Sequence, residues 1–243
     1  MRFYRRIILF FCMIPLGAFT MAKAPLIIDS PITADSAVIW LHGLGASQQD
    51  FAPVAHYLQD RYTPSTRYIL PQAPDLPVTL NGGYVMPAWY DLIDLTHPRT
   101  VKVEELDAAA RTIRALIDDM VNQGIAIDRI FLAGFSQGGA VVLHTAYVHE
   151  DLPLGGVLAL STYFPTSSDQ PLTEIQKNIP SIHLHGTLDP VVPIEYGKAA
   201  KDGLENLGVN AAWHTYPMRH EASEAEIQQI GQWLSEQLTQ SEG

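Results

Sequence analysis

A serine stands between two glycines where a strand-like run of residues meets a helix-like run. The segment Ile130 to Val142 reads IFLAGFSQGGAVV and contains the pattern Gly134-x-Ser136-x-Gly138. Glycines suit such a turn because a side chain at either position would collide with the strand or the helix. The turn holds the serine hydroxyl above the end of the strand, and the first N–H groups of the helix point toward it. The pattern therefore predicts that Ser136 is a nucleophile.

A serine hydroxyl becomes a good nucleophile when a histidine takes its proton and a carboxylate orients that histidine. After this kind of turn, the acid and then the histidine are expected further along the chain. Asp189 follows the strand-like run Ser181 to His185, and the histidines beyond it are His214 and His220. His214 lies inside a strand-like run, whereas His220 lies in a loop before the last helix. We therefore predict His220 as the base and Asp189 as the acid, with a plain Asp-Pro turn as the alternative for Asp189.

The oxyanion that forms when a serine attacks a carbonyl group needs two aligned N–H donors. The backbone of Gln137, the residue after the serine, is expected to supply one. The segment WLHGLGAS, Trp40 to Ser47, has glycines at 43 and 45 that allow its backbone to turn inward. We assign the second N–H to Leu44. A phosphate-binding loop is the alternative, but a third glycine and a Gly-Lys-Ser/Thr sequence are missing here.

Two further groups of residues have both a chemical and a structural interpretation. His183 and His185 alternate on a strand and face the same side. Because no carboxylate or third histidine stands at a matching spacing, we expect polar groups near the site entrance rather than metal ligands. The aromatic residues Tyr84, Trp89 and Tyr90 form either a part of the core or an apolar wall for an acyl chain.

The elements that must position these residues alternate along the chain. Strands are predicted at Ser36 to Leu41, Arg67 to Leu70, Arg129 to Ala133, Gly156 to Ser161, Ser181 to His185 and Ala211 to Tyr216. Helices are predicted at Phe51 to Gln59, Val103 to Asn122, Gln137 to Tyr147, Ile194 to Leu207 and Glu221 to Gln237. Apolar strands separated by amphipathic helices predict the α/β class, with a mainly parallel sheet covered by helices on both faces.

Two connections between these elements are longer than the fold requires. They are Pro71 to Arg99 and Thr162 to Asn178; both are rich in proline and turn residues, and both follow predicted strands. Ligands of open α/β sheets bind beyond the carboxyl ends of the strands. We therefore expect substrate contacts in these two connections.

Composition limits the classes of protein to which the chain can belong. Its 243 residues are 47% hydrophobic and 17% charged, which suits a single α/β domain. The net charge is −11, and the charged residues are scattered along the chain. Because nucleic-acid binding needs a basic stripe, a nucleic-acid partner is not expected.

The N-terminus has a different character from the rest of the chain. Three arginines precede the apolar run Ile7 to Ala22, whose length falls short of the roughly 18–20 residues that span a bilayer. We predict that residues 1–22 are a signal peptide cleaved after Ala22, that residues 23–243 form one domain, and that the protein is exported to the periplasm or secreted. Removal of the leader would lower the net charge from −11 to −14 and would take away Cys12, the single cysteine. The alternative is a cytoplasmic protein that starts at Met21.

Five segments together resemble one family. They are LHGLGAS, PVTLNGGYVMPAWYD, GFSQGGA, HGTLDPVVP and RHEAS, and they occur in this order between Pro25 and the C-terminus. They resemble the phospholipase/carboxylesterase family of α/β-hydrolases, which includes bacterial carboxylesterases and acyl-protein thioesterases. The resemblance implies an α/β-hydrolase fold with no large cap domain. It also implies an acyl-enzyme mechanism that uses the residues predicted above and no cofactor.

The resemblance also implies a class of substrate. We expect hydrolysis of carboxylic esters, with thioesters as a further substrate, and an apolar acyl groove that includes Leu80, Met86 and Trp89. Contact with lipid or with acylated molecules is a corollary of such a groove. Three alternatives stay open at this point: a lysophospholipase or acyl-protein thioesterase as the main activity, a peptidase on the same fold, and an inactive hydrolase that serves as a binding module.

Overall fold

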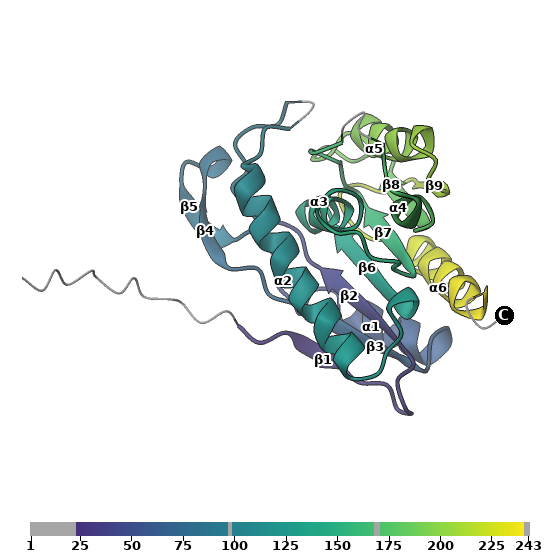
Figure 1. Cartoon of the computed structure of the whole chain (residues 1–243). Coiled ribbons are helices and arrows are strands. Elements are labelled where there is room, and N and C mark those ends of the chain that lie inside the picture. Colours follow the sequence, from purple (N-terminus) through teal and green to yellow (C-terminus); the bar gives the residue numbers. More distant parts are fainter. Residues whose placement is uncertain (1–22, 97–98, 168–170, 241–243) are drawn as a thin grey trace, which may run out of the picture.

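A seven-stranded sheet runs through the centre of the protein (Figure 1). The computed structural model describes residues 23–96, 99–167 and 171–240. The strands follow the order β1-β3-β2-β6-β7-β8-β9, and all neighbours are parallel except β1 and β3. Their bounds are β1 Leu26–Ile28, β2 Ser36–Leu41, β3 Thr66–Leu70, β6 Ile130–Phe135, β7 Gly156–Leu160, β8 Ser181–Gly186 and β9 Ala211–Tyr216. The predicted signal peptide, residues 1–22, lies outside the described residues.

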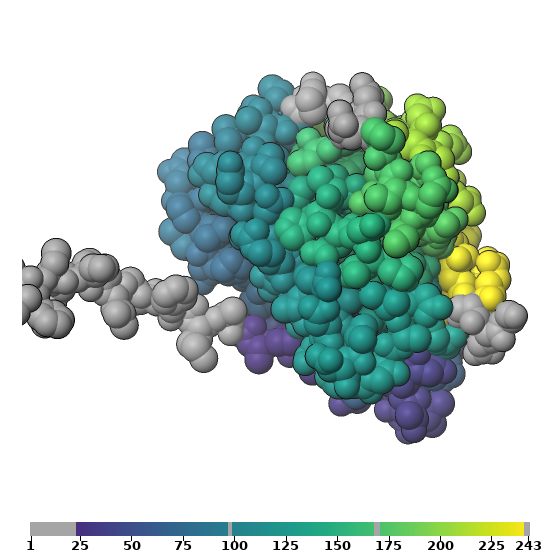
Figure 2. Space-filling model, viewed as in Figure 1, coloured from purple at the N-terminus to yellow at the C-terminus, as the bar shows by residue number. Residues whose placement is uncertain are grey.

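Helices cover both faces of this sheet. They are α1 Ala52–Arg61, α2 Val103–Asn122, α3 Gln137–His144, α4 Glu174–Lys177, α5 Ile194–Asn206 and α6 Glu224–Gln240. In Figure 2, the side chains of α2 and of the segments from α3 to α5 close over the sheet on the face that is toward the viewer. The α/β fold that the sequence predicts is confirmed. Within the described ranges, no helix is both long and apolar enough to cross a membrane.

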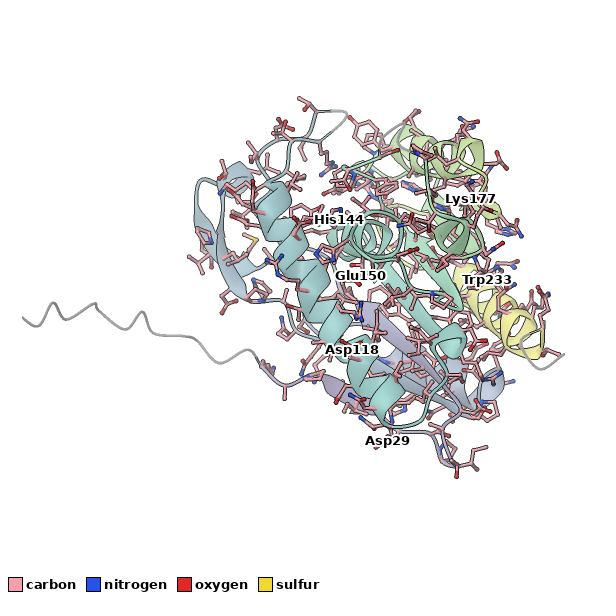
Figure 3. The ribbon with its side chains drawn as sticks, in the orientation of Figure 1. Asp29, Asp118, His144, Glu150, Lys177 and Trp233 are labelled. Atoms are coloured by element: carbon pink, nitrogen blue, oxygen red, sulfur yellow. The ribbon has the colours of Figure 1, made fainter. Side chains whose placement is uncertain are left out.

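Strand β2 shows how the sheet separates two apolar cores. Its residues Ala37, Ile39 and Leu41 belong to the core under α2, α3 and α5. Val38 and Trp40 belong to the core under α1 and α6. Successive side chains of a strand point to opposite faces, so an entirely apolar strand must be covered on both sides. In the second core the ring of Trp233, labelled on α6 in Figure 3, packs edge-on against Phe131 with ring centroids 6.1 Å apart.

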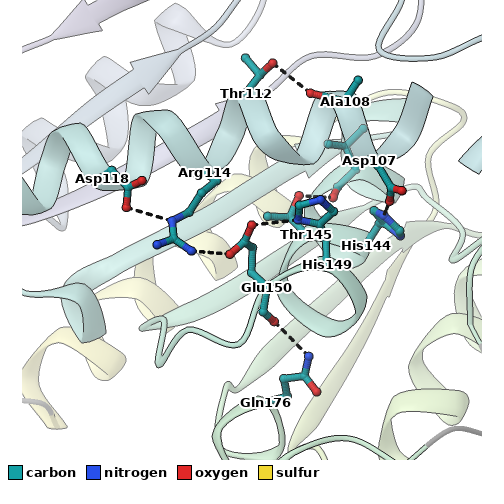
Figure 4. A network of polar contacts seen from close by, with 11 residues as sticks. Asp107, Ala108, Thr112, Arg114, Asp118, His144, Thr145, His149, Glu150 and Gln176 are labelled. Carbon is teal, nitrogen blue, oxygen red and sulfur yellow. Dashed lines mark hydrogen bonds and ion pairs between the residues drawn. The ribbon is translucent and has the colours of Figure 1, made fainter. Parts of the chain in front are cut away.

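A polar network fastens α2 to the end of α3 (Figure 4). His144 Nε2 lies 2.8 Å from Asp107 Oδ1 of α2. After α3 the chain makes a wider π-helical turn, Thr145–His149, so that α3 ends before the predicted Tyr147. Glu150 then accepts a hydrogen bond from Arg114 of α2 and is 2.8 Å from His149 Nδ1. These contacts fix the helix whose first turn follows Ser136.

Predicted and observed elements differ mainly at their ends. The strands Ser36–Leu41 and Ala211–Tyr216 and the helix Val103–Asn122 have the predicted bounds, while the other predicted elements shift by one to three residues. Helix α6 begins at Glu224 instead of Glu221. The reason is a pair of capping bonds: Ser223 Oγ accepts the Glu226 N–H, and the Glu226 carboxylate accepts the Ser223 N–H, each at 3.3 Å. His220 consequently lies in a loop.

The connection Pro71 to Arg99 contains structure that the sequence did not indicate. A short hairpin is formed by β4, Asp75–Val78, and β5, Tyr84–Pro87, with a 3-10 turn at Thr79–Asn81. The side chains of Val78, Ala88 and Leu92 form a small core beneath it. The hairpin is therefore stabilised by its own apolar contacts, beside the carboxyl edge of the main sheet.

Glu226 is an acidic residue that is fully buried. It is 0% exposed, and its Oε1 atom has no hydrogen-bond partner among the described residues. Burial raises the pKa of Glu226 to about 8, against the lowering effect of the Ser223 N–H. The unfolded chain loses this proton near pH 4.5, whereas the folded protein keeps it until about pH 8. The free energy of unfolding therefore falls as the pH rises between these values.

The variant Glu226→Gln is expected to be more stable than the parent at pH 8 and similar to it at pH 4.5. Glutamine has nearly the shape of the protonated acid and has no charge to bury. The midpoint of thermal unfolding, measured from pH 4.5 to 9, reports the effect, at about 2–4 °C per kcal/mol for a chain of this size. Glu224→Gln, a substitution of an exposed residue in the same turn, is the control. An equal effect of both variants at every pH would contradict the account.

Candidate active site

Ser136 occupies a strained backbone conformation between β6 and α3. Its φ is 53° and its ψ is −117°, a region that residues with a side chain rarely adopt. The Ser136 N–H donates to the carbonyl of Leu160 at 2.9 Å, and the Ser136 carbonyl accepts the hydroxyl of Thr162 at 2.6 Å. These two bonds from the end of β7 hold the strained turn in place. Strain of this kind concentrates at functional sites.

The glycines around Ser136 allow three pieces of backbone to meet. A Cβ atom on Gly134 would lie 2.4 Å from the backbone of Gly138. A Cβ atom on Gly138 would lie 2.6 Å from the carbonyl oxygen of His42 and 2.7 Å from that of Leu41. Helix α3 therefore lies directly against the end of β2, where the loop with Leu44 begins. The glycines that the sequence analysis assigned to a sharp turn also set the distance between α3 and this loop.

Asp189 and His220 come together at the carboxyl edge of the sheet. His220 Nδ1 lies 2.7 Å from Asp189 Oδ2, although 31 positions separate the two residues. The Asp189 side chain is fully buried. Its other oxygen, Oδ1, accepts the backbone N–H groups of Val191 at 2.8 Å and Val192 at 2.9 Å. The carboxylate is thus held by three hydrogen bonds in a fixed orientation toward the imidazole.

These contacts keep Asp189 ionised. Burial alone would raise the pKa of Asp189. The hydrogen bond to His220 and those from the two backbone N–H groups outweigh burial, so that the pKa lies below its ordinary value of 3.8. An ionised carboxylate accepts the Nδ1 proton of the imidazole. This leaves Nε2 of His220 without a proton, as a general base requires.

Ser136 and His220 line the same cavity. It has a volume of about 580 Å³ and also exposes Leu44 and Gln137. The ring of Phe135 packs against the His220 imidazole with centroids 4.7 Å apart. Within the described part of the chain, the Ser136 hydroxyl makes no hydrogen bond. Hydrogen bonds between nucleophile and base are often loose before substrate binds and tighten in the complex.

His42 shapes the loop on which Leu44 lies, a role that the sequence analysis missed. Its Nε2 accepts the Ala73 N–H at 3.1 Å, so the ring proton is on Nδ1, which donates to the Gly43 carbonyl at 2.8 Å. Burial lowers the pKa of His42, in keeping with a neutral ring. The indole N–H of Trp89 donates to the His42 carbonyl at 2.8 Å. The Leu44 N–H has no acceptor among the described residues and so is free to bind an oxyanion.

The side chain of Gln137 is a second feature that the sequence did not reveal. Its Oε1 accepts the Trp89 N–H at 2.9 Å, and its Nε2 donates to the Tyr90 carbonyl at 2.8 Å. The backbone N–H of Gln137 is the first of the helix and has no intrahelical acceptor. The side chain therefore anchors the neighbouring loop while the backbone N–H stays available beside Ser136.

The three expected substrate contacts occupy different places. Leu80 lines the cavity that contains Ser136. Met86 packs on the small core beneath the hairpin, and its sulfur would lie 3.6 Å from a Cβ on Gly45. Trp89 is 4% exposed and lines a separate pocket between the hairpin and α2. Only Leu80 of the three is therefore in a position to touch a substrate in the main cavity without rearrangement of the described residues.

His183 and His185 are not near the site entrance, which corrects the expectation from the sequence. Both are 1% exposed, because β8 lies inside the sheet. His185 is 3.7 Å from Asp189 Oδ2 and 2.9 Å from the Val192 carbonyl, so it packs behind the acid. His183 is 3.2 Å from the Ser181 hydroxyl, and burial lowers its pKa to about 3. Within the described ranges, no cluster of three or more metal-binding side chains occurs.

The variant Gly138→Ala is expected to lose activity by about 100-fold or more and to lower the unfolding temperature. The new methyl group would meet two backbone oxygens that cannot move without separating α3 from β2, and small displacements of catalytic groups have effects of this size. Ester turnover and thermal unfolding measure the two effects. The control is Gly203→Ala in α5, where the Cβ would meet only a serine hydroxyl at 3.2 Å. Full activity of Gly138→Ala would contradict the account.

Known proteins with similar sequences belong to one family. The chain matches the family model described as Phospholipase/Carboxylesterase over residues 22–238. It is 36% identical over 214 residues to acyl-protein thioesterase 1 homolog 1 of Dictyostelium discoideum, covering 87% of this chain and 95% of that protein. It is also 36% identical over 204 residues to acyl-protein thioesterase 1 of Debaryomyces hansenii, with coverage of 80% and 88%.

Solved structures agree with the sequence comparison. Arabidopsis thaliana SOBER1 superposes with a TM-score of 0.77 at 31% identity, covering 84% of this chain and 99% of that one. The Bacillus cereus carboxylesterase superposes with a TM-score of 0.74 at 19% identity, with coverage of 90% and 96%, a likeness that concerns the fold. The resemblance found in the sequence is therefore confirmed. The chain is a hydrolase that belongs to the phospholipase/carboxylesterase family of α/β-hydrolases.

Proposed function

We propose that this protein hydrolyses acyl thioesters and carboxylic esters through Ser136, with acyl thioesters as its main substrates. The observation that supports the proposal most is the shared cavity, in which Ser136 and His220 lie beside an apolar wall. The preference for thioesters rests on the relatives named acyl-protein thioesterases, which cover most of the chain. The cavity volume of about 580 Å³ falls within the usual range of small-molecule sites.

The first half of the reaction forms an acyl-enzyme. The Ser136 oxygen attacks the acyl carbon while His220 Nε2 takes the hydroxyl proton. Asp189, ionised and held by three hydrogen bonds, stabilises the imidazolium that results. The protonated imidazole then gives its proton to the departing sulfur or oxygen. The bond from the acyl carbon to the leaving group breaks, and a serine ester remains.

The oxyanion of each tetrahedral intermediate is assigned to the N–H groups of Leu44 and Gln137. Neither group is committed to another acceptor in the described structure. A donor of this kind contributes roughly 3–4 kcal/mol of barrier reduction. In the second half, His220 takes a proton from water while the water oxygen attacks the serine ester. The bond from the acyl carbon to the Ser136 oxygen then breaks, the imidazolium returns its proton to that oxygen, and the carboxylic acid leaves.

The wall of the cavity suits an acyl chain. Phe51, Val54 and Leu92 supply its apolar surface, together with Ile227 of α6. Leu95 at its rim is 52% exposed and Leu80 is 37% exposed. Exposed apolar side chains around the opening favour substrates that present an acyl group from a lipid or from an acylated molecule. Leu80 is the residue of the predicted groove that we assign to substrate contact.

A panel of acyl thioesters and matched p-nitrophenyl esters of graded chain length tests the proposal. The purified protein is expected to hydrolyse both, with larger kcat/KM for the thioesters, and Ser136→Ala is expected to lower kcat by about 10⁶-fold. Ser47→Ala, a substitution of a half-buried serine outside the triad, should keep its activity. Turnover by Ser136→Ala at the parent rate would rule out the assigned nucleophile.

The variant Asp189→Asn is expected to lower kcat by about 10⁴-fold with little change in KM. An amide in this place favours the wrong tautomer of His220, with the proton on Nε2. Since the pKa of Asp189 lies below 3.8, the carboxylate is charged at neutral pH, and the loss of kcat measured there reports the removal of that charge and of its control over the tautomer. A fully active Asp189→Asn would argue against the triad.

A further inference from the structure

Arg99 brings a permanent positive charge to the wall of the cavity that contains Ser136. The residue is 5% exposed, and it is the one Lys or Arg among the described residues that line this cavity. A guanidinium group keeps its proton at every physiological pH. Arg99 therefore places a nearly buried cation in a site whose other walls are mostly apolar.

The contacts that Arg99 makes in the described structure do not neutralise this charge. Nη2 donates to the carbonyl of Val191 at 2.8 Å, and Nε is buried with no hydrogen-bond partner. The guanidinium carbon lies 4.4 Å from the ring centroid of Tyr163 and 5.9 Å from that of Tyr196. Aromatic faces attract a cation but supply no anionic oxygen. A buried charge that lacks an anion is costly unless a ligand supplies one.

Three other arginines of the described chain have carboxylate partners, whereas Arg61, Arg111 and Arg219 have none among the described residues. Arg67 pairs with Asp29, Arg114 with Asp118 and Glu150, and Arg129 with Asp35. Within the described ranges, no carboxylate pairs with Arg99, although the chain has 26 acidic residues. Acidic side chains are therefore abundant, but none is placed at the buried cation.

The strand order places Arg99 on one side of Ser136. Tyr163 and Val191, its contacts, follow β7 and β8, while Ser136 follows β6. Asp50, which also lines the cavity, follows β2 on the other side of β6. Two acids therefore line the cavity, Asp50 toward β2 and Glu221 in the loop that also contains His220, while the cation Arg99 lies toward β7 and β8. A substrate with an anionic end is attracted to the Arg99 side and repelled from the Asp50 side.

We propose that Arg99 binds an anionic group of the substrate, a carboxylate or a phosphate, in the same cavity in which Ser136 attacks the acyl carbon. Guanidinium groups bind both anions with paired N–H donors. The inference rests on the proposed function, because the anion must belong to the molecule that reaches Ser136. The substrates of this enzyme are then acyl esters or thioesters that bear negative charge, either on the far end of the acyl chain or on the leaving group.

The test compares charged and neutral substrates of equal length. On the acyl side, mono-p-nitrophenyl adipate is compared with its methyl ester, after subtraction of spontaneous hydrolysis. On the leaving-group side, a lysophosphatidic acid is compared with the monoacylglycerol that has the same acyl chain. We expect the parent protein to prefer the charged member of at least one pair by about 10- to 100-fold in kcat/KM, the range for a hydrogen bond to a charged group. The pair that shows the preference identifies the source of the anion.

Variants then separate anion binding from a structural role. Arg99→Gln is expected to reduce the charged-to-neutral ratio of kcat/KM by about 10- to 100-fold, and Arg99→Lys, which keeps the charge, to retain part of it. Arg111→Gln removes an exposed arginine of α2 and should leave the ratio unchanged. A purely structural Arg99 would lower both kcat/KM values equally and leave the ratio as it is.

The outcomes distinguish failure of the role proposed for Arg99 from failure of the proposed hydrolase activity. If the parent protein hydrolyses the neutral substrates but prefers neither charged member, the role of Arg99 is excluded and the proposed hydrolase stands. An unchanged ratio in folded Arg99→Gln excludes it as well. If no substrate is hydrolysed in a manner that depends on Ser136, the proposed function itself fails. The parent ratio is informative even if Arg99→Gln does not fold.

Discussion

The close approach of α3 to the ends of β6 and β2 is the constraint on which the site depends. Gly134 and Gly138 allow backbone to touch backbone there, at separations that leave no room for a Cβ atom. This contact places the first N–H of α3 and the loop with Leu44 next to Ser136. It also forces Ser136 into a positive φ, which bonds from Leu160 and Thr162 support. Geometry that a flexible loop could not maintain is thus built into the packing of regular elements.

The charges and hydrogen bonds of three buried side chains add to the geometry that packing sets. Asp189 is buried yet ionised because three donors surround it, and the carboxylate in turn selects the tautomer of His220. His42 is buried and neutral, and it orients the loop that contains Leu44. Arg99 is buried and charged with no carboxylate among the described residues. The three arrangements have different consequences: the first activates a base, the second fixes a backbone, and the third leaves a charge for a ligand to satisfy.

Local patterns predicted the fold and the order of the proposed triad. The helix Val103–Asn122 was predictable because its apolar residues recur with helical spacing, and β2 because it is apolar from Ala37 to Leu41. The hairpin β4–β5 was not predictable, because Pro77 and a run of turn residues interrupt the sequence pattern that is typical of strands. The side-chain bonds of Gln137 to Trp89 and Tyr90 span about 50 positions. No local pattern indicates such bonds, and the same holds for the environment of Arg99.

A crystal structure of the protein after reaction with an acyl-mimicking phosphonate tests the central claim most directly. The account predicts a covalent bond from phosphorus to Ser136 Oγ, with the phosphonyl oxygen about 2.7–3.1 Å from the N–H groups of Leu44 and Gln137 and an ester oxygen near His220 Nε2. An adduct on another residue, or a phosphonyl oxygen that points away from both N–H groups, would contradict it.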